Sequence, residues 1–510
     1  MSGKKFDRAV LVSFKKFMDV VAATVTDNGD AKATPLGQLV TDHLGSDATT
    51  LPVVSETIAD HRLVDADIAL DNIAGTAGQI VHGVSGGQQR FHSTMSEMLA
   101  NPFMAYRPAP VDYTARPTGP DTSRQVVAFG LRLLTFHNEP VAVIQRAANQ
   151  QFGRNEAELE VMAATTETVT AFLAELRRLM IEHSVLRGQV LSFAGSQFGA
   201  SAGVTFLPRP DISAEQIILP DGVLKSVVDH VIGIGEKRDD LLAAGQHLKR
   251  GVLLFGPPGT GKTLTVKHLL TRTPDITTVL LTGSSIAYIG AAAEIARTFQ
   301  PSIVVMEDID LVAMQRSSTP QPLLFEVLDA LDGLDGDADV AFVMTTNRVQ
   351  VLERALAERP GRVDLAVEID LPGSAERRRL FHRYAAGLPF SQQALDDAAA
   401  RSDGVTGSFA KELIRRSVLA AALRGEPATD TDLNNALEDL LSTRESLTRR
   451  LLGAGGPDAE RWNPETELDD EPSPAQFLQP LNGMPAMNST ISIHTDDNGT
   501  HINAPEEDSP

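Results

Sequence analysis

The sequence lacks several residues and patterns, and each absence narrows the classes of protein that it can encode. It contains no cysteine, which excludes disulfide bonds, zinc–thiolate sites and cysteine-dependent catalysis and is what we expect of a cytoplasmic protein. No apolar run approaches the roughly 18 residues of a transmembrane helix, so we expect no integral membrane segment. Lys and Arg (45) are outnumbered by Asp and Glu (67), and the net charge of −22 argues against general binding to nucleic acid.

Much of this negative charge lies at the C-terminal end of the sequence. Residues 451–510 contain twelve acidic residues and one Arg, a balance of −11, among many Gly, Pro, Asn and Ser residues. This composition predicts a disordered acidic tail. Trp462, the only tryptophan, lies within it and is either a docking point or an incidental residue.

A chain of 510 residues is too long for one hydrophobic core and predicts about three to four domains. Changes in pattern place the boundaries. We predict a helical and irregular region at 1–119, a small α+β domain at 120–215, an α/β domain at 216–372, a helical lid at 373–447 and the acidic tail at 448–510.

Residues 1–215 contain no motif with a recognisable chemistry. Near the N-terminus, apolar residues recur at helical spacing at Phe6, Val10, Leu11, Phe14, Phe17, Met18 and Val21. They predict an amphipathic helix that either packs on its own domain or docks on a partner or a membrane surface. Further along, the pattern predicts short strands between residues 124 and 150, a long helix from Asn155 to His183, and a strand and turn at Ser192–Pro210.

One segment points to a ligand class through its own residues. It reads Gly256-Pro257-Pro258-Gly259-Thr260-Gly261-Lys262-Thr263. A predicted buried strand precedes it and a helix beginning at Leu264 follows, which is the context of a phosphate-binding loop. Glycines let backbone N–H groups face phosphate oxygens, while Lys262 reaches the β- and γ-phosphates and Thr263 coordinates Mg²⁺. The segment therefore predicts binding of a nucleoside triphosphate with Mg²⁺.

The surrounding residues alternate between predicted strands and helices, which is typical of a parallel α/β sheet. The predicted strands are Val252–Phe255, Thr278–Leu281, Ile303–Met306, Val340–Met344 and Leu365–Ile369. Residues 373–447 are helical in pattern throughout. The predicted fold class is therefore α/β, a parallel phosphate-loop sheet followed by an all-helical lid.

Polar residues follow two of these strands, and two arginines flank a Pro-Gly turn further along the sequence. Glu307 and Asp308 end one strand, where carboxylates can hold Mg²⁺ and polarise an attacking water. Asn347 ends another strand, where its amide can bind that water or the γ-phosphate. Arg359 and Arg362 flank a Pro-Gly corner and can stabilise transition-state charge on the nucleotide of a neighbouring subunit.

With these motifs in order, residues 217–447 resemble the AAA family of ATPases. Gly256–Thr263 is similar to Walker A, Glu307 and Asp308 to the end of Walker B, Asn347 to sensor 1, and Arg359 and Arg362 to the paired arginine fingers. Gly407 and Ser408 match the place where the lid meets the adenine base. The resemblance implies ATP and Mg²⁺ as cofactors and a homohexameric ring with ATP sites between subunits.

The order of the two carboxylates departs from the family pattern. Most relatives end Walker B with Asp and then Glu, whereas this chain has Glu307 and then Asp308. By position, Glu307 takes the metal-side role and Asp308 the role of the base. Because Asp is one methylene shorter than Glu, the water is placed differently, and we expect slow but real hydrolysis.

A second segment bears on what the ATPase acts on. Tyr288-Ile289-Gly290 resembles the aromatic–hydrophobic–glycine triplet that lines the central pore in ring translocases of this family. On a mobile loop, the ring of Tyr288 would grip side chains of any sequence through apolar contact. The alternative is that Tyr288 packs at the start of the helix that follows.

Two functions remain open at this point. One is a motor that remodels, unfolds or disassembles protein substrates through its pore, with residues 1–215 selecting the substrate or an adaptor. The other is an ATP-binding scaffold or switch that hydrolyses little and recruits partners through its N-terminal domain and tail. A nucleic-acid motor is disfavoured by the charge. The sequence contains no His-Glu-x-x-His, so we expect no fused zinc protease.

Overall fold

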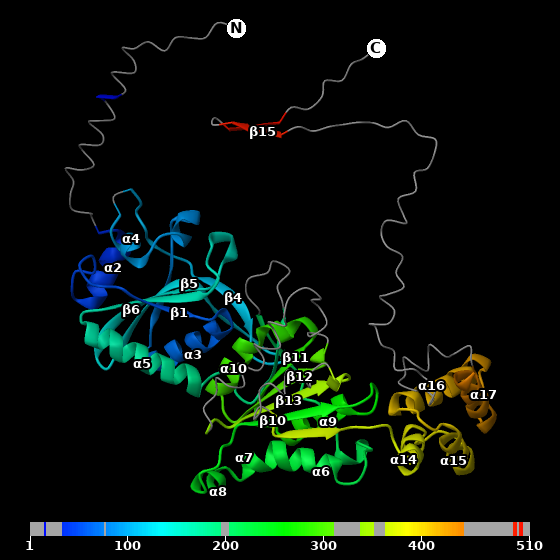
Figure 1. The fold of residues 1–510 in the computed structure, drawn as a ribbon. Coiled ribbons are helices and arrows are strands. Elements are labelled where there is room, and N and C mark those ends of the chain that lie inside the picture. Colours follow the sequence, from blue (N-terminus) through cyan, green and yellow to red (C-terminus); the bar gives the residue numbers. More distant parts are fainter. Residues whose placement is uncertain are drawn as a thin grey trace, which may run out of the picture. The chain divides into compact units, whose positions relative to one another are not determined.

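The structure is a computed structural model that describes residues 15–16, 33–75, 78–101, 103–194, 203–310, 337–350, 363–442, 493–496 and 499–502 (Figure 1). The chain divides into two units, Met1–Gly455 and Gly456–Pro510. In its described part, the second unit consists of the antiparallel strands β15 (Ile493–Asp496) and β16 (Gly499–Ile502). Almost all of the predicted N-terminal helix, and Trp462, lie outside the described residues.

An antiparallel sheet occupies the N-terminal part of the first unit. Its strands are β1 (Val54–Ile58), β2 (Ile80–Val84), β3 (Pro108–Ala109), β4 (Asp112–Pro117), β5 (Ser123–Phe136), β6 (Glu139–Arg146) and β7 (Ala157–Ala163). They pair in the order β1-β7-β6-β5-β2-β3, and β4 also pairs with β5. Because β1 pairs with β7 and β4 with β5, this sheet crosses the boundary that we predicted at residue 120.

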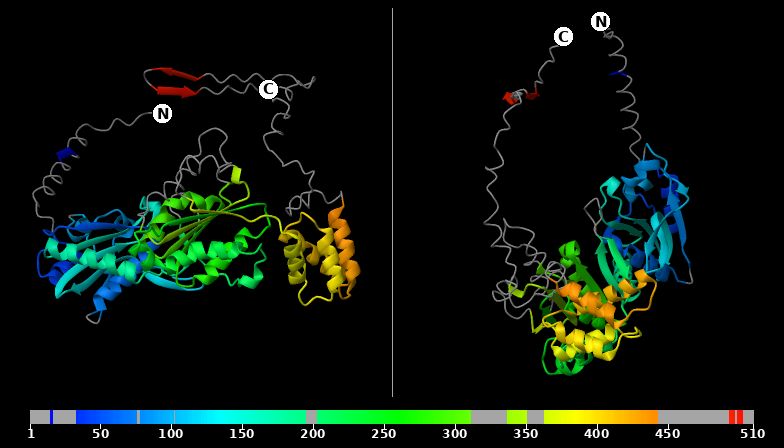
Figure 2. Two further views of the ribbon diagram at one scale, coloured as in Figure 1. Left: turned by 60° about the horizontal axis from the view of Figure 1, so that its bottom comes forward. Right: turned by 90° about the vertical axis from the view of Figure 1, so that its right-hand side faces the viewer.

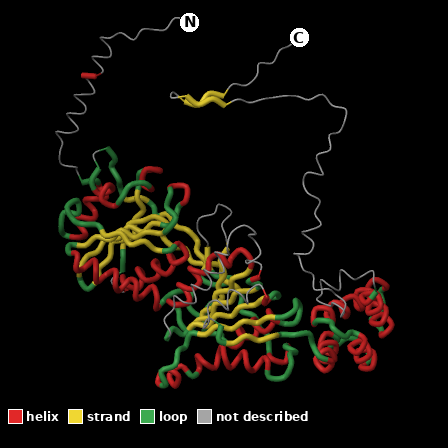
Figure 3. The backbone as a smooth tube through the Cα atoms, viewed as in Figure 1, coloured by secondary structure: helices red, strands yellow, loops and turns green. Residues whose placement is uncertain are grey.

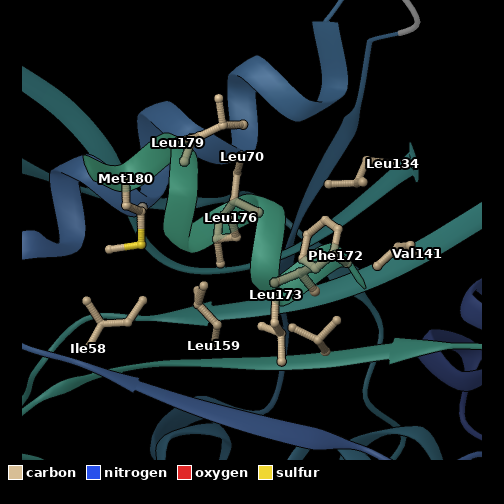
Figure 4. Packing of buried hydrophobic residues seen from close by; sticks show 14 of the residues in the cluster. Ile58, Leu70, Leu134, Val141, Leu159, Phe172, Leu173, Leu176, Leu179 and Met180 are labelled. Atoms are coloured by element: carbon tan, nitrogen blue, oxygen red, sulfur yellow. The ribbon is translucent and has the colours of Figure 1, made fainter. Parts of the chain in front are cut away.

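Both faces of this sheet are buried. Its central strands have apolar residues at consecutive positions, and successive residues point to opposite faces. In β6, Val141 and Val143 enter one core, whereas Ala142 and Ile144 enter the other. Helices α3 (Leu63–Ala74) and α5 (Thr166–Glu182) contribute to the first core, and α2 (Pro35–Leu44) and α4 (Met95–Leu99) to the second. Figure 4 shows Phe172, Leu173 and Leu176 of α5 packed beside Leu159 and Val141.

The helix predicted from Asn155 is wrong in its first part. Ala157–Ala163 is strand β7, in which alternate residues enter the first core, and this period of two is that of a strand. Helix α5 begins only at Thr166, where the Thr165 side chain accepts the N–H of Thr168 as an N-cap.

The second sheet contains the predicted phosphate loop. Its strands are β8 (Val190–Ala194), β9 (Gly203–Leu207), β10 (Arg250–Phe255), β11 (Thr277–Thr282), β12 (Ser302–Glu307), β13 (Val340–Thr346) and β14 (Leu365–Glu368). They lie in the order β14-β10-β13-β12-β11-β8-β9, and only β8 and β9 pair antiparallel. The five predicted strands are confirmed. Two further strands come from residues that the sequence pattern placed in the preceding domain.

Helices cover both faces of this second sheet as well (Figure 3). They are α6 (Val223–Val228), the π-helix η6 (Asp229–Gly233), α7 (Ile234–Glu236), α8 (Arg238–Ala243), α9 (Lys262–Arg272), the 3-10 helix η7 (Gly283–Tyr288) and α10 (Ile289–Thr298). Val266 and Leu269 of α9 pack into one core, and Ala292 and Ile295 of α10 pack into the other. This arrangement confirms the predicted α/β class.

In the described residues 363–442, four helices follow the second sheet, as predicted for the lid. They are α14 (Ser374–Tyr384), α15 (Gln392–Arg401), α16 (Gly407–Arg424) and α17 (Asp430–Leu441), and they share one core around Phe381, Phe409 and Leu437. Figure 2 shows them in yellow to orange as one group. No helix in the described ranges is both long enough and apolar enough to cross a membrane.

Candidate active site

The phosphate loop joins the end of β10 to the start of α9. Gly256 has φ 139°, and a Cβ on it would lie 2.2 Å from the backbone oxygen of Ile369, beyond the end of β14. A side chain is therefore excluded where the loop leaves the sheet. The loop ends at Gly261, and Lys262 is the first residue of α9, so the helix N-terminus faces the space over the loop.

Lys262 lies buried within its own loop. Its ammonium group donates hydrogen bonds to the carbonyl oxygens of Gly256 and Pro257, each at 2.7 Å. Burial lowers the pKa of Lys262 to about 8, and the nearby carboxylates of Asp308 and Asp310 partly oppose this shift. A bound anion would favour the charged form, so the lysine is suited to sense a phosphate.

A cavity of about 450 Å³ opens over the loop, which is within the range of about 300–1,000 Å³ for small-ligand sites. Most of the predicted site residues line it: Pro258, Gly259, Thr260, Gly261, Lys262, Thr263, Leu264, Asp308, Asn347, Gly407 and Ser408. Gly256 and Pro257 do not, but their carbonyls hold Lys262. Glu307 also does not line the cavity.

The lid closes one side of this cavity through the start of α16. The Ser408 N–H points to the carbonyl oxygen of Gly259 at 3.4 Å, and a Cβ on Gly259 would lie 2.6 Å from the Ser408 hydroxyl. Thr406 caps the helix by accepting the N–H of Phe409. The structure thus brings the predicted lid residues against the phosphate loop, over 140 residues away in sequence.

Asp308 and Asn347 meet at the carboxyl ends of β12 and β13. The Asn347 amide donates to Asp308 Oδ1 at 3.0 Å. Asp308 has the left-handed backbone angle φ 52°, and its N–H donates to the Thr345 hydroxyl at 3.0 Å. The two polar groups that the sequence predicted around an attacking water therefore share one edge of the cavity.

The residues predicted to hold Mg²⁺ fit such an ion. Glu307 Oε1 is buried and has no hydrogen-bond partner, while Thr263 is exposed into the cavity. Within the described residues, no group of three or more His, Asp or Glu side chains is placed to hold a metal by itself. Mg²⁺ often uses one or two carboxylates together with substrate phosphates and water, so this sparse donor set is suitable.

Asp310 is a site residue that the sequence did not reveal. Its buried carboxylate accepts the Thr346 hydroxyl at 2.9 Å and the Asn347 N–H at 3.3 Å. It thereby fixes the end of β13 from which Asn347 projects. Its place two residues after Asp308 was the only available signal, and a third acid at a strand end is ordinarily exposed.

Other residues that reach the cavity also escaped the sequence interpretation. They include Ile217 before α6, Lys267 on α9, Glu376 and Tyr384 on α14, and Lys411 on α16. Burial raises the pKa of the Tyr384 hydroxyl, so it stays a neutral donor. Nothing in the spacing of the lid helices indicated which of their faces would turn toward the loop.

Tyr288 occupies a packed position in this single chain. It ends η7, directly before α10, and its ring stacks on Phe193 with the centroids 5.4 Å apart. Ile289 is 1% exposed, whereas Gly290 has open space around it. This geometry corresponds to the alternative in which the ring packs at the start of the helix, rather than to a mobile loop.

The two predicted arginine fingers cannot be placed. Arg359 and Arg362 lie outside the described residues, so their role stays a prediction.

Comparison with known proteins also points to a nucleotide-binding site, as the phosphate loop and its cavity do. Residues 252–371 match the family described as "ATPase family associated with various cellular activities (AAA)". The ATP-dependent zinc metalloprotease FtsH 2 of Sphaerobacter thermophilus is 31% identical over 317 residues, which cover 57% of this chain and 48% of that protein. The proteasome-activating nucleotidase of Methanothermobacter thermautotrophicus is 32% identical over 265 residues, covering 48% and 63%.

A third relative is the 26S proteasome regulatory subunit 4 homolog of Dictyostelium discoideum, 33% identical over 210 residues, covering 38% of this chain and 47% of that protein. The matched segment is therefore no more than 63% of the length of any of these three relatives.

Proposed function

We propose that this chain, whose residues 252–371 match the AAA family of ATPases, hydrolyses ATP with Mg²⁺ and uses the energy to remodel protein substrates. The observation that carries the proposal is the convergence of Lys262, Thr263, Asp308 and Asn347 on one cavity. Lysine and the helix N-terminus bind phosphate, threonine completes a Mg²⁺ shell, and the last two residues orient water.

Each site residue has a defined part in this proposal. Lys262 leaves the loop carbonyls to bind the β- and γ-phosphates, and Thr263 and Glu307 are the residues that would hold Mg²⁺. When bound there, the ion would neutralise charge on the phosphates. Asp308 accepts a proton from the attacking water, and the Asn347 amide holds that carboxylate at 3.0 Å.

A protein is the substrate class that the relatives favour. Their names describe a protease, a proteasome-activating nucleotidase and a proteasome regulatory subunit. In our proposal the chain forms a homohexameric ring in which Arg359 and Arg362 reach the neighbouring nucleotide. Tyr288, Ile289 and Gly290 engage the substrate, and the domain built on the first sheet selects the substrate or an adaptor.

An ATP-controlled switch is the second candidate, and two observations favour it. Asp308 provides a shorter base than the Glu that most relatives carry at this position, and Tyr288 is packed on Phe193 instead of standing free. A protein of this kind would bind ATP through the same loop but turn it over slowly.

Steady-state ATP hydrolysis distinguishes the two candidates. Wild-type protein and Asp308→Asn are compared over a series of protein concentrations, with Mg²⁺ and with EDTA. Turnover that rises with concentration, requires Mg²⁺ and falls about 100-fold or more in the variant supports the motor. Tight ATP binding without turnover above background would rule the motor out in favour of the switch.

A further inference from the structure

We propose that Thr345 is a positioning residue for Asp308: its hydroxyl holds the backbone of residue 308 in the conformation that turns the short carboxylate toward the cavity. The inference rests on the proposed ATP hydrolysis. Thr345 lies on β13, one residue before Thr346 and two before Asn347, and it does not line the cavity itself.

The backbone evidence is a two-point attachment between the neighbouring strands β12 and β13. The Asp308 N–H donates to the Thr345 hydroxyl at 3.0 Å, and the Ile309 N–H donates to the Thr345 carbonyl at 3.1 Å. Regular pairing of the two strands ends at Met306 and Met344. Thr345 therefore binds the backbone of residues 308 and 309 just after β12 leaves the sheet.

The conformation that this attachment holds is one that residue 308 would not adopt readily by itself. Its φ of 52° lies in the left-handed region, which costs an L-residue about 1–2 kcal/mol and which Asp visits where local hydrogen bonds support it. Thr345 is 1% exposed, so its hydroxyl is a buried acceptor for this N–H. Without that acceptor, the Asp308 N–H loses its partner and the strained backbone is free to relax.

The side chain of Asp308 shows why this matters for catalysis. Asp308 lines the cavity, and its Oδ1 accepts the Asn347 amide at 3.0 Å. The carboxylate is thus fixed from two sides, by Thr345 through the backbone and by Asn347 through the side chain. A misplacement of about 1 Å in a reacting group can cost about 100-fold in rate.

The test compares Thr345→Val, which keeps the branched shape but removes the hydroxyl, with Thr345→Ser, which keeps the hydroxyl. We expect Thr345→Val to lower kcat at least about 10-fold while the Kd for a fluorescent ATP analogue with Mg²⁺ changes less than about twofold. Thr345→Ser should retain most of the wild-type kcat. Thr345→Ala replaces the valine variant if the latter does not fold.

Thr278 offers a matched control in the same sheet. It lies on β11, is 0% exposed, and its hydroxyl has no hydrogen-bond partner. Thr278→Val should leave kcat unchanged, which separates loss of this particular hydrogen bond from the general effect of a buried Thr→Val change.

The outcomes separate this inference from the proposed function. If the wild type hydrolyses ATP and Asp308→Asn does not, the proposed function stands. Unchanged kcat in Thr345→Val, or a Kd that weakens in parallel with kcat, then overturns the role of Thr345 alone. If the wild type does not hydrolyse ATP, both proposals fail.

Discussion

The ring of Tyr288 stacks on the ring of Phe193, with centroids 5.4 Å apart and planes inclined by 30°. Phe193 belongs to β8, one of the two strands that the sequence pattern did not assign to this sheet. A stacked aromatic pair contributes about 0.5–1.5 kcal/mol beyond its buried area. The ring must give up this stacking, and the apolar area that it buries, in order to grip another chain.

We predict that Tyr288→Ala keeps basal ATP hydrolysis within about twofold of the wild type but abolishes stimulation by an unfolded protein such as casein, because the gripping ring is lost. Tyr288→Phe, which keeps an aromatic ring, should retain both activities. The measurement is ATP turnover with and without casein. Loss of basal turnover, or unfolding of Tyr288→Ala, would instead make packing on Phe193 the main role of this residue.

We predict that ATP affinity falls as the pH rises above 8. The pKa of Lys262 is lowered to about 8, so the lysine loses its charge as the pH rises through this value, whereas the triphosphate binds the charged form. With a charged lysine in the complex, Kd should rise about fivefold between pH 8 and pH 9. Binding should also take up protons there, which calorimetry in two buffers of different ionisation enthalpy detects.

Lys262→Arg is the control for this pH dependence, because a guanidinium stays charged throughout the range. Any residual ATP binding by Lys262→Arg should be independent of pH between 8 and 9. A flat profile for the wild type would show that Lys262 is fully charged without nucleotide and would contradict the lowered pKa.

We predict that Gly256→Ala destabilises the protein by at least about 2 kcal/mol. The added Cβ would lie 2.2 Å from the Ile369 carbonyl oxygen, at a φ of 139° that residues with side chains avoid. Gly290→Ala is the matched control, because Gly290 lies in α10 with nothing within 4 Å of its added Cβ. Denaturant unfolding of the two variants should differ clearly, and equal stabilities would refute the close contact.

We predict that Arg362→Ala lowers kcat by about 1,000-fold while leaving the Kd for ATP nearly unchanged, because an arginine finger acts on a neighbouring subunit's nucleotide. Mixing this variant with Lys262→Ala subunits should restore part of the turnover, since each supplies the part that the other lacks. A parallel loss of nucleotide affinity in Arg362→Ala would argue against action between subunits.

Local pattern was sufficient for most of the second sheet. Five buried apolar runs predicted β10 to β14, since residues buried on both faces of a parallel strand form continuous apolar segments. The strand and turn predicted at Ser192–Pro210 correspond to β8 and β9, but the pattern placed them in the preceding domain, and only pairing with Thr278 and Val279 assigns β8 to this sheet. Local residues carry no record of such a long-range pairing.

The sequence by itself predicted a nucleoside triphosphate as the ligand and named the loop residues, Asp308 and Asn347, which the structure places around one cavity. The spacing of glycines, Lys262 and Thr263 is a local property of one loop. The apolar strand before it places that loop at the end of the sheet. Only the tertiary structure decided how Asp308 is held, that Asp310 supports the site, that the lid residues Glu376, Tyr384 and Lys411 line the cavity, and that Tyr288 rests on Phe193. These features depend on contacts between residues that are far apart in sequence. Packing and buried hydrogen bonds decide which of these residues meet, and local sequence patterns do not record them.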